Sequence, residues 1–225
     1  MTSPPHEWQI PQREYDRQES RRGRRFAYET LDPRATALVV VDMVGFFVEE
    51  SARCRAAVPA INDLATTLRD AGGTVAWVLP QVHPPTEWEI GFYGAEVAAM
   101  FAASGGEGTL RERLWHALDA RDGDVWAEKS ASSAFFPGRS DLPGQLGERG
   151  IDTVLITGTV TGVCCESTAR DAATLGNRVI MIADGMAGID DAAHSATLRT
   201  VYRSFGDVRT AAEVLGLIEA ALHSR

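Results

Sequence analysis

Cysteine is scarce in this chain of 225 residues, and the few cysteines present do not fit a cross-linked or metal-bound protein. Cys54, Cys164 and Cys165 are odd in number and two of them are neighbours, so no disulfide framework is indicated. Their spacing matches no zinc site. We expect Cys164 and Cys165 to be reduced, and we expect neither a bound metal nor another cofactor.

Long apolar runs and an excess of positive charge are also missing. No segment approaches the ~20 apolar residues of a membrane span, and the N-terminus lacks the apolar stretch of a signal peptide. The net charge of −9 argues against nucleic acid and anionic membranes as partners. These features predict a cytoplasmic globular protein, whose length suits one large domain.

Lysine is nearly absent, because 21 of the 22 basic residues are arginine and Lys129 is the only lysine. Arginine cannot lose its charge and carries a bulky planar fork, whereas lysine is a compact point charge. Lys129 is therefore a candidate for a role that arginine cannot fill. The alternative is that its position is an accident of composition.

Short apolar runs alternate along the chain with segments of helical periodicity. Such alternation favours a parallel sheet covered by helices on both faces. We predict a three-layer α/β/α fold with a six-stranded, mainly parallel, Rossmann-like sheet. The expected strands are 37–41, 74–79, 124–128, 154–156, 178–183 and a short one at Val208; the expected helices are 54–70, 110–120, 142–149, one beginning around Cys164, 190–205 and 211–223.

The first 35 residues differ from the rest, with seven arginines, six acids and few apolar side chains. We therefore divide the chain into a polar N-terminal arm, residues 1–35, and a folded domain, residues 36–225. The basic stretch 17–25 fits either a solvated arm or short helix, or an arm laid across a sister subunit. Because the arm has little apolar surface for its own core, we expect a homodimer or homotetramer.

The stretch 153–172 reads as a buried strand, a turn containing Gly158 and Gly162, and a helix that begins around Cys164. A thiol in the first turn of a helix lies near unpaired N–H groups and the positive end of the helix dipole, which favour the thiolate. This pattern predicts a nucleophilic Cys164. The alternative is that Cys164 is a small buried core residue, as most free cysteines are.

Three ionisable side chains follow predicted strands. Asp42 ends the first strand, Lys129 lies just past the third, and Cys164 follows the fourth. Open α/β sheets bind ligands beyond the carboxyl ends of their strands, so we expect these three side chains to converge on one site. Each taken alone also has a structural reading: Asp42 as a cap, Lys129 as a surface residue and Cys164 as core.

Aromatic residues gather on segments predicted to be loops. Residues 81–94 and 130–138 combine proline or glycine with bulky side chains, and residues 43–47 form a third loop. We expect these loops to give an apolar substrate pocket, although packing of one loop against another is the alternative. The predicted lining residues are Phe46, Phe47, His83, Trp88, Phe92, Phe135 and Phe136.

These motifs resemble those of the isochorismatase-like cysteine hydrolases over residues 37–220. The resemblance rests on Val41-Asp42-Met43 followed by Phe46 or Phe47, on Lys129 in AEKSASSAF, and on GTVTGVC at 158–164 with Thr168-Ala169. It implies a catalytic triad of Asp42, Lys129 and Cys164. It also implies a cis peptide between Thr159 and Val160, which turns the N–H groups of Val160 and Cys164 toward an oxyanion.

The resemblance further implies a function in the amidohydrolase branch of that family. The chain departs from the family pattern at Val44, where glutamine is common, and at Cys165, where valine is common; it also lacks the Asp-x-His-x-x-His metal set of nicotinamidases. We therefore expect metal-independent cleavage of a non-peptide carbon–nitrogen bond in a small amide, ureido compound or lactam, through a thioester. Vinyl-ether hydrolysis of the isochorismatase type and a non-catalytic thiol-containing binding protein are the alternatives. Members of the family commonly form oligomers.

Overall fold

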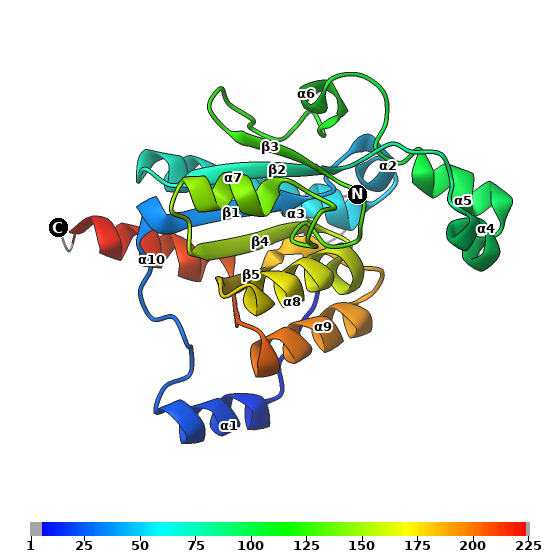
Figure 1. Ribbon diagram of the computed structural model, residues 1–225. Helices are drawn as coiled ribbons and strands as arrows, with labels where there is room; N and C mark the ends of the chain where they lie inside the picture. Colours follow the sequence, from blue (N-terminus) through cyan, green and yellow to red (C-terminus); the bar gives the residue numbers. More distant parts are fainter. Residues whose placement is uncertain (1–5, 224–225) are drawn as a thin grey trace.

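The computed structural model describes residues 6–223 and shows a single parallel sheet in the order β3-β2-β1-β4-β5-β6 (Figure 1). All five strand pairings are parallel, which confirms the predicted fold class. The order places β1 beside β4, and the chain reverses its direction of travel across the sheet at that point. The strands are β1 (Thr36–Val41), β2 (Thr74–Pro80), β3 (Val125–Lys129), β4 (Thr153–Thr159), β5 (Arg178–Ala187) and β6 (Asp207–Arg209).

Helices cover both faces of the sheet, because the central strands are apolar on both sides. In β1, Val39 belongs to the core cluster that includes residues of α7 (Leu142–Glu148), α8 (Glu166–Thr174) and α9 (Asp191–Ser204). Its neighbour Val40 belongs to the cluster on the opposite face, which includes residues of α3 (Ala52–Asp70) and α10 (Ala211–His223). All six residues of β1 are buried. The sheet is thus the middle layer of three, as the continuous apolar run predicts.

Residues 81–94 were expected to be a loop, and this expectation is wrong. The segment contains α4 (Glu87–Tyr93), and α5 (Ala95–Ala102) follows it after Gly94. The start of α4 is fixed by a reciprocal capping box, in which the Thr86 hydroxyl accepts from the Glu89 N–H and the Glu89 carboxylate accepts from the Thr86 N–H. This local cap outweighs the glycine and the aromatic content of the segment.

The helix expected over 110–120 is also shorter than predicted. It ends as α6 (Leu110–Arg113), because Leu114 is extended and forms an antiparallel bridge with Val44. The N–H of Trp115 then donates to the carbonyl of Met43. These contacts hold the loop after β1, which includes the short α2 (Gly45–Val48), against the segment that leads to β3.

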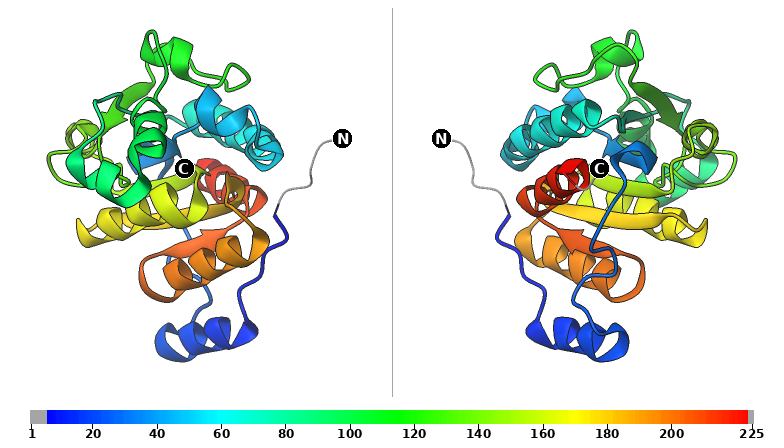
Figure 2. Two further views of the ribbon diagram at one scale, coloured as in Figure 1. Left: turned by 90° about the vertical axis from the view of Figure 1, so that its right-hand side faces the viewer. Right: turned by 90° about the vertical axis from the view of Figure 1, so that its left-hand side faces the viewer.

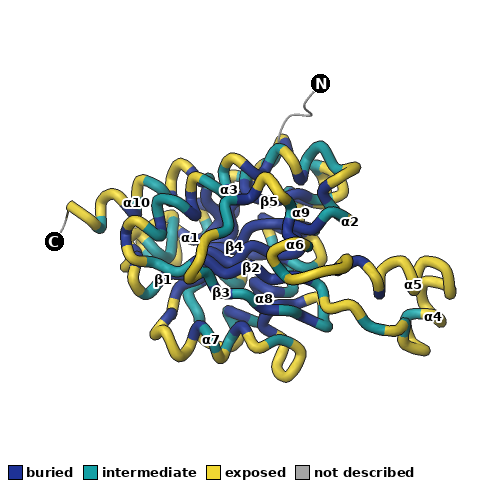
Figure 3. The backbone as a smooth tube through the Cα atoms, turned by 90° about the horizontal axis from the view of Figure 1, so that it is seen from above, coloured by how far each residue is buried: buried dark blue, intermediate teal, exposed yellow. Residues whose placement is uncertain are grey.

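The α4–α5 pair projects from the body of the molecule (Figure 1). None of the seven residues of α4 is buried, and the pair stands out as a largely exposed extension when the sheet is viewed from above (Figure 3). Trp88 is 66% exposed and Phe92 is 69% exposed, and their rings stack with centroids 5.3 Å apart. The projection therefore carries aromatic side chains away from the core.

The N-terminal arm packs on its own chain, which removes one reason for expecting an oligomer. Its helix α1 (Gln12–Arg22) lies beside α9 (Figure 2). The ring of Tyr15 meets that of Tyr202 edge-on at 4.9 Å, and the Gln18 amide donates to the Tyr202 carbonyl at 3.3 Å. After a 3-10 turn, Pro33–Ala35, the chain enters β1. Residues 1–5 of the arm and residues 224–225 lie outside the described part of the chain.

Candidate active site

The candidate site lies where β1 and β4 end, at the point of reversal in the strand order. Such a point is where open α/β sheets bind ligands. Asp42 follows β1 with a φ of 56°, and its N–H donates to the carbonyl of Val78 at 2.9 Å. Gly158 in β4 has a φ of 107°, and a Cβ there would lie 2.1 Å from the carbonyl oxygen of Val41. Only glycine lets β4 approach β1 this closely beside Asp42.

Lys129 joins the two other predicted site residues. Its ammonium lies 2.8 Å from Asp42 Oδ2, and the two side chains are 4% and 1% exposed. The same ammonium lies 3.5 Å from Cys164 Sγ and donates to the carbonyl of Ala131 at 3.1 Å. The structure therefore brings Asp42, Lys129 and Cys164, which come from the ends of three strands, into one cluster, in which Asp42 and Lys129 are buried and Cys164 is partly exposed.

Cys164 sits within a π-helical turn rather than at the first residue of an α-helix. The turn spans Thr161–Cys165, and α8 begins only at Glu166, two residues later than the sequence indicated. The peptide bond between Thr159 and Val160, immediately before the turn, is cis. The carbonyl of Val160 accepts from the N–H groups of Val163 and Cys165, at 3.0 and 3.3 Å. These bonds fold the turn back on the end of β4.

Cys165 has different surroundings from its neighbour. Its side chain is completely buried in the core on the α8 side of the sheet, and its sulfur lies 3.8 Å from the carbonyl oxygen of Thr157. Burial, followed by the charges of Cys164 and Asp42, raises the pKa of the Cys165 thiol well above its ordinary value. Cys165 is therefore a packing residue, and Cys164 is the thiol that contacts Lys129.

The environment of Cys164 does not favour a standing thiolate, contrary to the expectation from the helix dipole. Burial, and then the charge of Asp42, raise the pKa of Cys164 to about 12, although Lys129 acts in the opposite direction. Burial also raises the pKa of Asp42, and Lys129 offsets part of that rise. Burial lowers the pKa of Lys129, but Asp42 and Cys164 outweigh it and the net direction is upward. At neutral pH the resting thiol is protonated, beside a carboxylate that is more basic than usual.

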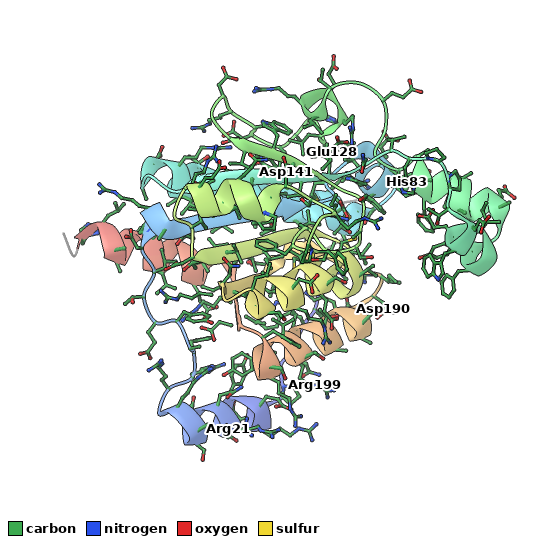
Figure 4. All side chains as sticks on the ribbon, in the orientation of Figure 1. Arg21, His83, Glu128, Asp141, Asp190 and Arg199 are labelled. Carbon is green, nitrogen blue, oxygen red and sulfur yellow. The ribbon has the colours of Figure 1, made fainter. Side chains whose placement is uncertain are left out.

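Four of the seven side chains expected to line a pocket, those of Phe46, Phe47, Trp88 and Phe92, belong to one chain of ring contacts that runs through Phe101 and Tyr93. Phe46 contacts Phe47, with ring centroids 4.8 Å apart, near the end of β1. Phe135 is 1% exposed and belongs to the core, and Phe136 beside it is half exposed. Trp88 and Phe92 lie on the exposed face of α4. His83 lies where the chain leaves the body toward that helix (Figure 4), and its Nε2 is 3.7 Å from Glu89.

Sequence reasoning missed the residues that support the nucleophile turn. The hydroxyl of Thr161, the first residue of the turn, shares a 2.9 Å hydrogen bond with Nδ1 of His194 on α9. The Thr168 hydroxyl on α8 accepts from the N–H of Ala134, and this bond connects the loop after Lys129 to α8. No spacing in the sequence links residues 161 and 194. Of the supporting residues, only Thr168 could have been found from the sequence, because it belongs to the motif around Cys164.

The described residues, 6–223, contain neither a metal-binding cluster nor a membrane-spanning helix. Within that range, no three His, Cys, Asp or Glu side chains gather in a way that could hold a metal ion. None of the helices in the same range is both long and apolar enough to cross a membrane. The ionisable groups that meet at the site are a thiol, a carboxylate and an ammonium.

Comparison with known proteins gives the family. Residues 36–213 match the isochorismatase domain. The chain is 32% identical over 190 residues to the uncharacterized isochorismatase family protein YwoC of Bacillus subtilis. The aligned region covers 82% of this chain and 95% of that protein. It is 28% identical over 219 residues to the ureidoacrylate amidohydrolase RutB of Caulobacter vibrioides, covering 83% of this chain and 92% of that protein.

Solved structures agree with the sequence match. A cysteine hydrolase from Pseudomonas syringae superposes with a TM-score of 0.76 at 28% identity, over 87% of this chain and 98% of that one. N-carbamoylsarcosine amidase from Thermoplasma acidophilum gives a TM-score of 0.65 at 27% identity, over 78% and 96%. Together with the domain match over most of the chain, these likenesses show that the protein belongs to the isochorismatase family and is a hydrolase.

Proposed function

We propose that this hydrolase cleaves a non-peptide carbon–nitrogen bond of a small amide, ureido compound or lactam, without a metal and through a thioester on Cys164. The observation that carries the proposal is the contact of one buried ammonium, that of Lys129, with both Asp42 and Cys164. A carboxylate and a thiol that contact the same cation can serve as base and nucleophile. Relatives named as amidohydrolases support the choice of bond.

The acylation step follows from the protonation states. With a pKa of about 12, Cys164 needs a base at neutral pH, and the raised pKa of Asp42 suits it to accept the proton. The sulfur then attacks the carbonyl carbon of the substrate. The N–H groups of Val160 and Cys164 are the proposed donors to the developing oxyanion, an interaction worth roughly 3 kcal/mol per donor. Asp42 passes its proton to the leaving nitrogen, the carbon–nitrogen bond breaks, and a thioester remains on Cys164.

The deacylation step uses the same carboxylate. Asp42 takes a proton from a water molecule, whose oxygen attacks the thioester carbonyl. The carbon–sulfur bond breaks, the product leaves as a carboxylic acid, and the proton on Asp42 returns to the sulfur. Each proton that Asp42 accepts is thus delivered within the cycle, so no metal-bound water and no redox partner enters the scheme.

A panel of primary amides, N-carbamoyl amino acids, ureido acids and lactams tests the proposal. Ammonia release measures the first three classes, and mass spectrometry measures ring opening of the lactams. Intact-mass measurement of the enzyme during turnover is expected to show an acyl adduct that maps to Cys164. Pyruvate release from isochorismate without turnover of any amide would contradict the proposal and favour vinyl-ether hydrolysis. An adduct on a residue other than Cys164 would contradict the mechanism.

A further inference from the structure

His6 is buried although it belongs to the arm, outside the residues that match the family domain. Its side chain is 1% exposed, whereas the domain match begins at residue 36. Nδ1 of His6 lies 2.6 Å from Asp191 Oδ1, and Nε2 accepts from the N–H of Gly188 at 2.8 Å. Because Nε2 accepts, Nδ1 carries the proton and donates to Asp191. Both ring nitrogens are therefore fixed by partners in the domain.

The His6 ring lies against the side chain that holds the nucleophile turn. It stacks on His194 with centroids 4.2 Å apart and an angle of 11° between the planes. His194 is completely buried, and its Nδ1 shares the 2.9 Å hydrogen bond with Thr161 Oγ1. Burial lowers the pKa of His194 to about 4, so the ring is neutral at pH 7. The contacts run from the arm through His194 to the first residue of the turn.

The backbone of Gly188 also connects His6 with His194 and Thr161. Gly188, whose N–H is bonded to His6, follows β5, and a Cβ there would lie 3.4 Å from both His194 Cβ and Thr161 Oγ1. Asp191, the partner of Nδ1, lies one residue after Asp190, whose carboxylate caps α9 (Figure 4). Asp191 also accepts from Arg53 of α3 at 3.1 Å, and its pKa is lowered chiefly by the His6 hydrogen bond. His6 thus fixes the end of β5 and the start of α9 at once.

We propose that His6 is a positioning residue for the nucleophile: acting through His194 and Gly188, it fixes Thr161 and so sets the orientation of the turn that carries Cys164 toward Asp42. The inference rests on the proposed role of Cys164. In a π-helical turn such as Thr161–Cys165, each hydrogen bond spans one residue more than in an α-helix. The side chain of Thr161, its first residue, is held by a hydrogen bond to His194 of α9. Releasing that side chain lets the sulfur move relative to its base.

The variant His6→Ala tests this directly. It removes the stacked ring and the hydrogen bonds of His6 to the Gly188 N–H and the Asp191 carboxylate, which keeps its bond to Arg53. We expect kcat to fall by about 10- to 100-fold with KM little changed, because a small misplacement of a reacting group costs rate rather than binding. The pH dependence of Cys164 alkylation by iodoacetamide is expected to shift as well, since the thiol leaves its place beside Asp42 and Lys129. His223→Ala, which removes an exposed histidine on α10, is the matched control and should change neither.

Two further variants keep the test decisive if His6→Ala folds poorly. His6→Asn retains a donor toward Asp191 and should recover part of the rate. Thr161→Val retains volume but removes the hydrogen bond to His194, and it should produce the same shift in the alkylation profile as His6→Ala. If both residues act along one route, the double variant His6→Ala/Thr161→Val is no slower than the slower single variant.

The outcomes separate this inference from the proposed function. A lower melting temperature for His6→Ala with unchanged kcat and an unchanged alkylation profile would overturn the positioning role, as would strict additivity in the double variant. If the wild-type protein turns over no amide, but the alkylation profile of Cys164 still shifts in His6→Ala and Thr161→Val, the amidohydrolase proposal fails while the positioning role stands.

Discussion

Replacing Lys129 by methionine removes the charge from the site while keeping most of the side-chain volume. The ammonium lies 2.8 Å from Asp42 Oδ2, and both side chains are nearly inaccessible to water. At an effective dielectric constant of about 20, the gross attraction of two unit charges at this distance is about 6 kcal/mol. Removing one partner of a buried pair costs about 3–5 kcal/mol of stability when the other stays charged. Asp42 can avoid that cost only by taking up a proton.

The uptake of a proton by Asp42 determines how the stability of Lys129→Met depends on pH. Without Lys129, the largest effect that offsets burial is lost, so the pKa of Asp42 rises further and the carboxylate loses its proton only at higher pH. A carboxylate with a raised pKa in the folded state binds its proton more tightly there than in the unfolded state. Stability should therefore fall as pH rises, and the loss relative to wild type should be larger at pH 8 than at pH 5.

Activity should also fall, but with the opposite pH dependence, because the loss should be larger at low pH. A protonated Asp42 cannot accept the proton of Cys164, so kcat/KM at pH 7 should fall by about 10²- to 10⁴-fold. The acid limb of the pH–rate profile should move to higher pH. Lys129→Arg retains the charge, but its planar fork is larger than an ammonium, and we expect it to fail nearly as badly. Turnover measured from pH 5 to 9 and urea unfolding at both ends of that range give the two profiles.

Arg69→Met supplies a matched control at the opposite end of the sheet. Arg69 pairs with Asp124 at 2.7 Å, just before β3 begins, and Asp124 is 4% exposed. This variant also breaks a buried ion pair, so it should lose stability but keep the wild-type pH–rate profile. Near-wild-type turnover in Lys129→Met, or an acid limb that does not move, would refute the assignment of Lys129 to the site. The single lysine would then be an accident of composition.

Four further results are expected. Cys164→Ser should fold and lose nearly all turnover while Cys165→Ser stays active, and the reverse pattern would place the nucleophile one residue later. Activity should survive exhaustive chelation, and a loss restored by zinc or iron would contradict the metal-independent scheme. Because the pKa of His194 is about 4 in the folded protein, against an ordinary value of 6.5, the unfolded state takes up the proton first, and stability should fall by about 3 kcal/mol between pH 6.5 and 4 in urea titrations; His194→Gln should flatten that slope. Sedimentation at micromolar concentration should show a homodimer or homotetramer, and a monomer would count against it.

The fold and the cluster at the strand ends were predictable because both depend on local pattern. A continuous apolar run such as 37–41 has one stable place, a strand covered on both faces. The end of such a strand fixes where Asp42 lies, and parallel strands bring all their carboxyl ends to one edge. The position of each side chain along its strand was therefore enough to group residues 42, 129 and 164.

The rest depended on burial and on distant contacts, which the sequence does not display. The helix dipole favours a thiolate at Cys164, but it is outweighed by the loss of water around the sulfur, and only the packed structure shows that loss. An aromatic residue in a loop looks the same whether it is buried, as Phe135 is, or exposed, as Trp88 is. His6 meets Asp191 across 185 residues, with no periodicity or motif to announce the contact.

The single lysine has a chemical reason in this geometry. An ammonium has three N–H groups and no acceptor, and Lys129 has three partners: the carboxylate of Asp42, the carbonyl of Ala131 and the sulfur of Cys164. In the proposed mechanism a proton passes from Cys164 to Asp42, so that the negative charge moves from oxygen to sulfur and the net charge of the cluster does not change. One cation in contact with both atoms stabilises the charge before and after the transfer, so a buried site can form a thiolate without creating an uncompensated charge. A guanidinium would spread its charge over a plane too wide to keep all three contacts, whereas a compact ammonium serves the two atoms between which the proton moves.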